Sequence, residues 1–279
     1  MTGRSHWGAA AVLGVMLLSA GRAEAGPWAV GRGHYYSKVS YQYRRSTTLA
    51  APDGTIFDIP TFNQQDSAAY LAYGATSALT LITDLPFVRS SDLHDMPDEL
   101  SRVTGIGDVR VGAQLQLGHR GPWVLAARGL VQAPTGDETR GNGLLPTGSG
   151  AWEGALALGA GRSFAGGRGY AYAELGWNLR GSGLRDGLLY EAQIGWSVAP
   201  RLVLAANVRG LEPRGEPPGA LRPGSFVGTG DGVAYVTYGP TAIVRLSAGW
   251  GLQLDVEGAA HVKNIAAGTV YRVGVTYQR

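Results

Sequence analysis

Residues 271–279 read YRVGVTYQR, and their apolar and polar side chains alternate. In an extended chain, Tyr271, Val273, Val275 and Tyr277 therefore fall on one face, and the residues between them fall on the other. Segments of this kind, each roughly ten residues long, recur along the whole sequence. The pattern predicts strands that have lipid on one side and water on the other.

This recurrence predicts an all-β fold, a single transmembrane antiparallel up-and-down β-barrel of about 12 strands. The clearest alternation sets Val109, Val111 and Ala113 against Asp108 and Arg110. An even number of strands leaves both ends of the chain on the periplasmic side of an outer membrane. The expected strands are residues 35–44, 67–73, 79–85, 108–117, 125–132, 156–158, 173–180, 188–196, 202–209, 235–245, 252–261 and 271–279.

The connections between these strands alternate in length, which supports the same topology. Long polar connections are expected at Ser46 to Gln64, Arg89 to Gly105, Pro134 to Gly150 and Leu211 to Gly232. The connections between them are short. Barrels of bacterial outer membranes have long extracellular loops and short periplasmic turns, so the long connections are assigned to the outside.

Aromatic residues gather at the expected strand ends, where amphipathic rings favour the level of the lipid headgroups. The alternative is that they are core aromatics of a soluble β protein, but a packed core does not require placement at strand ends. We therefore predict two girdles. The inner one contains Tyr35, Tyr73, Trp123, Trp196, Trp250 and Tyr277, and the outer one contains Tyr43, Phe87, Trp152, Trp177 and Tyr271.

The N-terminus has the layout of a secretory signal peptide. Arg4 and His6 precede an apolar run whose core, Ala9 to Leu18, is shorter than the roughly 20 apolar residues of a membrane helix. The run is followed by Ala-Glu-Ala at residues 23–25. We expect a signal peptide at residues 1–25, cleavage between Ala25 and Gly26, and one outer-membrane barrel domain at residues 26–279.

Composition excludes several other classes of protein. The chain has no cysteine, so no disulfide framework stabilises it. Without Arg4, Arg22 and Glu24 the mature chain has 22 basic and 20 acidic residues, a net charge of +2, which does not favour nucleic acid as a partner. The 44 glycines of the full sequence have no period of three, so they indicate strand curvature rather than collagen.

If the apolar faces touch lipid, the opposite faces line the lumen and bring charges of both signs together. These charges either form cross-strand ion pairs that fill a narrow barrel or set a field along an aqueous path. The predicted lumen-lining residues are Arg44, Asp108, Arg110, Arg128, Glu174, Arg180, Glu191, Arg209, Asp255, Glu257 and Arg272.

No catalytic or cofactor site can be assembled from the sequence. His261, expected to point inward near the outer rim, is the best candidate for a general base, and no nucleophile accompanies it. No group of residues has metal-ligand spacing, and no cofactor is expected. The apolar residues in the outer loops either form a lid or plug or only steady the loops; they are Leu93, Met96, Leu100, Leu144 and Leu145.

Several segments together resemble the outer-membrane family labelled for the meta-pathway of phenol degradation. They are Tyr73-Gly74-Ala75-Thr76 followed by Leu85-Pro86, Gly105-Ile106-Gly107-Asp108-Val109, Pro134-Thr135-Gly136, and Lys263-Asn264. The resemblance covers most of the mature chain. It implies a transporter-type barrel for aromatic or hydrophobic compounds. The chain departs from such barrels at its end, Tyr277-Gln278-Arg279, because they often finish with an aromatic residue that the assembly machinery recognises.

These observations together predict a barrel of the bacterial outer membrane that passively transports small hydrophobic or aromatic compounds. The expected partners are outer-membrane lipid, the barrel assembly machinery and a small hydrophobic solute. Two alternatives remain: a structural or surface-interaction barrel with a filled lumen, and a barrel enzyme acting on envelope lipid.

Overall fold

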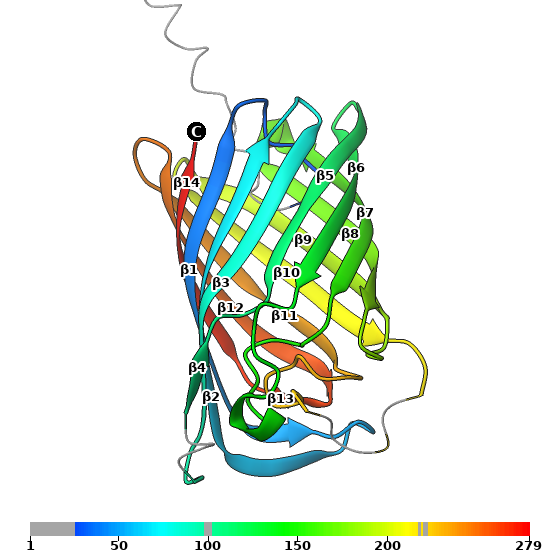
Figure 1. Ribbon diagram of the computed structural model, residues 1–279. Coiled ribbons are helices and arrows are strands. Elements are labelled where there is room, and N and C mark those ends of the chain that lie inside the picture. Colours follow the sequence, from blue (N-terminus) through cyan, green and yellow to red (C-terminus); the bar gives the residue numbers. More distant parts are fainter. Residues whose placement is uncertain (1–25, 98–101, 217–218, 220–222) are drawn as a thin grey trace, which may run out of the picture.

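The computed structural model describes residues 26–97, 102–216, 219 and 223–279, and these form a closed barrel (Figure 1). Fourteen strands make one sheet in which paired strands are antiparallel and long strands pair with their neighbours in sequence. The first, β1 (Tyr35–Ala50), also pairs with the last, β14 (Val270–Gln278). Twelve strands therefore build the wall, and two short strands, β4 and β13, are added at one end.

The other strands follow the predicted order along the chain. They are β2 (Ile56–Gly74), β3 (Leu79–Leu93), β4 (Val103–Gly105), β5 (Val109–Arg120), β6 (Trp123–Ala133), β7 (Glu153–Phe164), β8 (Gly169–Arg180), β9 (Gly187–Ala199), β10 (Leu202–Pro213), β11 (Ala234–Arg245), β12 (Trp250–Lys263) and β13 (Ile265–Ala267). Two single-turn 3-10 helices, Arg140–Gly143 and Ala165–Gly167, lie in connections. No helix within the described residues is long and apolar enough to cross a bilayer.

The wall has an apolar outer face and a mainly polar inner face, as the alternation predicts. On β7, Leu156 and Leu158 are 63% and 65% exposed, whereas their neighbours in sequence are small residues that face the lumen. Every wall strand carries such exposed apolar residues. Their contact is with hydrocarbon, because all backbone groups of a closed barrel pair within the wall and need no water. The predicted fold class is confirmed.

The seam between β1 and β14 is regular over nine residue pairs, from Tyr36 with Gln278 to Arg44 with Val270. At its inner end Tyr35 and Arg279 exchange two backbone hydrogen bonds of 3.0 Å. Closure removes the exposed strand edges that would otherwise pair with another chain.

Two of the predicted outer loops are wrong in extent. β1 continues to Ala50 and β2 begins at Ile56, so most of Ser46 to Gln64 is strand rather than loop. β3 continues to Leu93 and pairs with β4, which shortens Arg89 to Gly105. These extensions lie beyond the lipid-facing rows, where no hydrocarbon imposes a strict alternation and Leu49, Phe62 and Leu93 are instead buried against loops.

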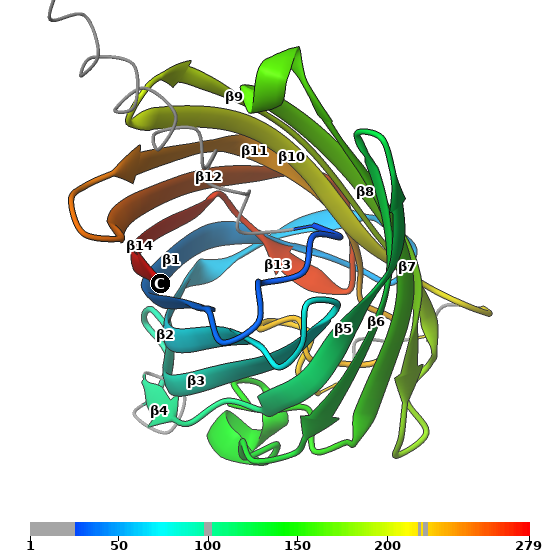
Figure 2. The same ribbon diagram turned by 90° about the horizontal axis from the view of Figure 1, so that it is seen from above.

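The two ends of the barrel differ in the way that the connection lengths predict. The end with short turns carries the C-terminus, and the other end carries the extended β1–β2 hairpin, β4, β13 and the long loops (Figure 1). Seen from the short-turn end, the segment before β1 lies across the opening (Figure 2). We call the short-turn end the inner end and the other the outer end. The predicted signal peptide at residues 1–25, including Ala25, lies outside the described residues.

Candidate functional site: a cavity inside the barrel

A cavity of about 580 Å³ lies in the middle of the lumen. Pockets that hold small molecules typically measure about 300–1,000 Å³, so this volume suits one small solute. Six of the eleven predicted lumen residues line it: Asp108, Arg110, Arg128, Arg180, Arg209 and Arg272. The other five, Arg44, Glu174, Glu191, Asp255 and Glu257, lie on the same inner face and contact lumen groups.

The inner end of the lumen is crossed by residues 26–34, which precede β1. Gln114 donates to the carbonyl oxygens of Gly26 (3.1 Å) and Trp28 (3.2 Å), and Gln116 accepts from the Ala29 N–H at 3.1 Å. The Val30 N–H donates to Thr80 Oγ1 at 3.0 Å. Inward-facing polar residues of β3 and β5 thus hold an irregular segment that has no ladder of its own.

Trp28 anchors this segment on β7 and β8, further around the wall. Its ring meets Tyr170 and Tyr172 of β8 edge-on, at centroid distances of 6.1 and 6.4 Å. Beside it, a side chain at Gly161 would come within 2.6 Å of Pro27 and 2.7 Å of Trp28. From its junction with β1, the segment therefore passes β3 and β5 and reaches β7 and β8. The sequence gives no signal for this role, since residues 26–34 have no periodicity.

The outer end is closed by a small hydrophobic core, which we call the outer apolar cluster. It combines strand ends with loop residues and consists of Leu49, Phe62, Leu93, Val103, Leu145, Val227 and Ala266. Met96 and Leu144 pack against it. The loop residues Val227, Gly228 and Thr229 also line the cavity, so the loop that contains them folds into the mouth.

Four of the five predicted apolar loop residues take part in this cluster or contact it, whereas Leu100 lies outside the described residues. Leu93 belongs to the end of β3 rather than to a loop. Both alternatives, a lid over the mouth and loops that steady each other, predict such a packed cluster.

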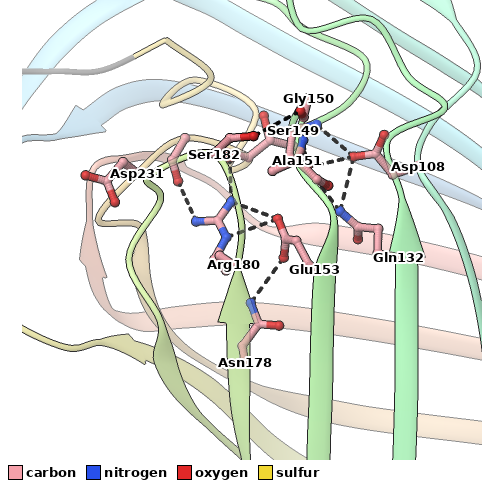
Figure 3. Close-up of polar contacts among 12 residues, drawn as sticks. Asp108, Gln132, Ser149, Gly150, Ala151, Glu153, Asn178, Arg180, Ser182 and Asp231 are labelled. Carbon is pink, nitrogen blue, oxygen red and sulfur yellow. Dashed lines mark hydrogen bonds and ion pairs between the residues drawn. The ribbon is translucent and has the colours of Figure 1, made fainter.

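Asp108 fixes the loop between β6 and β7 at the outer mouth (Figure 3). One carboxylate oxygen accepts from the Gly136 N–H at 2.9 Å, and the other accepts from the Ser149 N–H at 2.7 Å and from Gln132 Nε2 at 3.2 Å. A side chain at Gly148 would meet this carboxylate at 2.3 Å. The loop is therefore clamped at both of its ends by one buried side chain.

Arg180 holds the second inward-folded loop in a similar way. Its guanidinium pairs with Glu153 at 3.0 Å and donates to the carbonyl oxygens of Thr229 (2.8 Å) and Gly230 (3.0 Å) (Figure 3). Asn178 donates to the other oxygen of Glu153 at 3.1 Å. Two charged residues on strands β7 and β8 thus attach the loop to the wall.

The remaining lumen charges form two compact networks. Arg128 pairs with Glu174, and Tyr172 donates to Glu191, which lies opposite both Glu174 and Arg209 in the sheet. Further along the same wall, Glu257 pairs with Arg209 and with Arg272, the latter at 3.2 Å. Asp255 lies 3.7 Å from Arg272. These pairs balance charge within the wall and leave the cavity between them.

Two arginines are less compensated. Arg110 is exposed to the cavity and has one hydrogen bond, from Nε to Gln132 at 2.8 Å. Arg44 is buried below the outer apolar cluster, where it donates to Gln64 and to the Phe226 carbonyl oxygen at 3.1 Å.

One side of the cavity is apolar, whereas the sequence analysis predicted only charged residues along the lumen. Leu189, Leu211 and Tyr235 are aligned across β9, β10 and β11 and all line the cavity. Leu130 of β6 and Val227 of the inward-folded loop add to them. A solute in the cavity therefore meets both an apolar wall and charged side chains.

The predicted inward orientation of His261 is wrong. An irregularity in the β11–β12 ladder inserts one residue before His261, which then pairs with Val236. Since Tyr235 lines the cavity, Val236 and His261 face away from it. His261 Nε2 lies 3.7 Å from Glu212, and both side chains are 46% exposed. Among the described residues, no group of three His, Cys, Asp or Glu side chains is placed to hold a metal ion.

Comparisons with known proteins agree with this architecture. Residues 55–258 match the family described as "Putative MetA-pathway of phenol degradation". The fold is similar to a crystal structure of an outer membrane channel from Pseudomonas putida F1, with 18% identity, coverage of 91% of this chain and 98% of that one, and a TM-score of 0.66. It is also similar to the NanC porin, with 7% identity, coverage of 86% and 98%, and a TM-score of 0.55. No curated protein matches the sequence. The barrel is thus that of a protein of the bacterial outer membrane.

Proposed function

The chain belongs to the family described for the MetA-pathway of phenol degradation, and from this premise we propose that it passively transports small hydrophobic or aromatic compounds across the outer membrane. The observation that carries the proposal is the central cavity of about 580 Å³, which is apolar along β9, β10 and β11 and charged elsewhere. An aromatic ring packs on the apolar side, and its polar substituents meet the arginines.

The route begins at the outer mouth. The residues of the outer apolar cluster are at most 7% exposed, so a solute enters only when the loops that form the cluster move. Because Val227 belongs to both the cluster and the cavity wall, a small displacement of its loop connects the two. Exit requires either that residues 26–34 move aside at the inner end or that the solute leaves through the wall.

An exit through the wall has a candidate position at Pro240. Proline cannot donate to a ladder, and Gly239 and Pro240 of β11 have no partners on β12, although they pair with β10. Beyond Glu257, β12 also has no partner on β14. The wall therefore lacks part of its cross-strand pairing at this position.

Uptake by cells tests the proposal. We expect cells that produce the protein to accumulate labelled aromatic compounds and fatty acids faster than cells without it, at low external concentration. A panel that varies ring size and charge identifies the preferred solute. Equal uptake with and without the protein contradicts transport.

A second candidate function is a surface-interaction barrel with a filled lumen, which the dense ion pairing of the inner face favours. Conductance in planar bilayers distinguishes the two, since a filled barrel carries no current in any variant. The third alternative, an enzyme acting on envelope lipid, depends on His261 beside Glu212. We expect no phospholipid hydrolysis, and no change on His261→Ala.

A further inference from the structure

The inner end of the barrel carries basic residues without acidic ones. The segments of the chain that reach this end, residues 26–38, 72–83, 112–126, 158–173, 193–206, 242–254 and 273–279, contain no Asp or Glu. Six arginines in them are exposed: Arg32, Arg120, Arg162, Arg168, Arg201 and Arg279. The lumen contains charges of both signs that pair with each other. The charged side chains of these inner-end segments are all basic, so the electrostatic field at the inner end is positive.

Three neighbouring strands in two of these segments align an arginine, a tryptophan and a second arginine on the lipid-facing surface. Arg120 at the end of β5 pairs in register with Trp123 of β6, and Trp123 pairs with Arg162 of β7. Directly paired residues point to the same face of a sheet, and Trp123 is 49% exposed on the lipid side. The Arg162 guanidinium lies 5.3 Å from the centre of the Trp123 ring.

The neighbouring strands repeat part of this arrangement. Arg168 lies 5.7 Å from the ring of Trp196, whose own neighbour is Phe164 at 5.8 Å. Within the described residues, Arg120, Arg162 and Arg168 have no carboxylate partner. Stacking on a ring orients the planar guanidinium and leaves its N–H groups free to donate.

We propose that Arg120, Trp123 and Arg162 bind the headgroup phosphate of an anionic phospholipid in the inner leaflet of the outer membrane. Trp123 is a residue of the inner girdle and sets the level of the headgroups. The two arginines lie on either side of it, about 10 Å apart at the backbone since each strand spacing is about 4.8 Å, and their long side chains converge on one phosphate. Guanidinium groups match phosphate oxygens in two-bond geometry.

Charge selects the lipid class. Basic residues near a membrane surface attract anionic lipids, and the inner end offers them no internal competitor. A zwitterionic headgroup presents the same phosphate beside a positive amine, which the six arginines disfavour. The bound lipid would fix the inner rim of the barrel at the level of the lipid headgroups, near the opening that residues 26–34 cross.

The test is a titration of the purified, detergent-solubilised barrel with phosphatidylglycerol or phosphatidylcholine, read by native mass spectrometry. We expect phosphatidylglycerol to bind more tightly. The double variant R120Q/R162Q should lose affinity for it by roughly 30-fold, from about one favourable surface charge interaction per arginine. Trp123→Phe, which keeps both charges, should lose less.

A matched control removes two arginines at the outer end. R140Q/R214Q changes the net charge equally, and Arg214 lies 5.9 Å from the ring of Trp177, so it too loses a stacked pair. This variant should bind phosphatidylglycerol as the wild type does. Heat-modified mobility in electrophoresis verifies that each variant forms a barrel.

Three results would overturn the proposal. The first is equal binding of the two lipids, and the second is an unchanged affinity in R120Q/R162Q. The third is competition by an acidic peptide at the concentration at which phosphatidylglycerol acts, which would assign the inner rim to an acidic protein partner instead.

Discussion

Substitution of Gly161 by valine tests whether residues 26–34 close the inner end. Gly161 lies on the lumen face of β7, and its missing side chain leaves the space that Pro27 and Trp28 occupy, with contacts of 2.6 and 2.7 Å from the position of a Cβ atom. Ordinary contacts begin near 3.4 Å, so the Trp28 ring must leave its place. The barrel itself accepts valine, a residue that favours strands.

The size of the effect follows from the contacts that Trp28 makes. It has two edge-on ring contacts, with Tyr170 and Tyr172, and its carbonyl oxygen accepts one hydrogen bond from Gln114. Each of the three is worth about 1 kcal/mol, so their loss destabilises the closed position by about 3 kcal/mol. At 1.4 kcal/mol per factor of ten, the open population rises about 100-fold.

Single-channel recording in planar bilayers measures the result. We expect Gly161→Val to open far more often than the wild type and to conduct in longer events. Gly154→Val on the same strand is the matched control, because a Cβ atom there has only the Leu130 carbonyl oxygen as a neighbour, at 4.0 Å. If both valine variants conduct as the wild type does while remaining folded, the segment does not close the inner end.

Three further predictions concern the lumen and the outer loops. Glu257→Gln should lower the free energy of unfolding by about 1–3 kcal/mol, measured by urea titration in lipid vesicles. The nearly buried Glu257 carboxylate pairs with two arginines, and the value is modest because the Arg209 side chain is 38% exposed, so that water partly screens its charge. Asp108→Ala should release the loop between β6 and β7, which then becomes sensitive to protease on whole cells, whereas an intact loop in this variant would contradict the clamp. Hydrogen bonds from the hydroxyl and the backbone N–H of Thr139 hold the pKa of Asp137 below its ordinary value of 3.8. The protection of this loop from hydrogen exchange should therefore be constant from neutral pH down to 3.8 and decline at lower pH, where the carboxylate becomes protonated. A change in protection near pH 6 would refute this assignment.

The wall of the barrel could be predicted from the sequence because lipid and water impose a period of two on every spanning strand. All twelve expected strands are present, in the expected order and direction. The girdles follow from the same constraint, and the exposed Trp123, Trp152 and Trp250 lie at strand ends as expected.

The parts outside the lipid could not be predicted in the same way. The outer half of β2 contains Pro60, and its register with β1 shifts between Ser46 and Thr48. Proline and the broken alternation predict a loop for this stretch, although the structure shows a strand. The reversal of His261 depends on one inserted residue in β12, which shifts every later side chain to the opposite face.

The cavity was predictable in its charges but not in its boundaries. The lumen arginines and carboxylates follow from strand alternation alone. Trp28, however, meets Tyr170 and Tyr172 only because the barrel closes, and Leu189 and Leu211 become a continuous apolar wall only through their register. Such contacts depend on residues far apart in the chain, for which a single sequence holds no signal.

The most direct test of the account is a disulfide across the seam that closes the barrel. Val39 of β1 and Val275 of β14 are directly paired, and antiparallel partners lie within the range of Cα separations that a disulfide spans. The chain has no native cysteine, so a V39C/V275C variant gives an unambiguous signal. The account predicts efficient cross-linking in outer membranes, and none for V39C/L252C, whose positions are separated by the intervening strand β14. Cross-linking that is absent from the folded V39C/V275C protein, or equal in the two variants, would contradict a closed barrel.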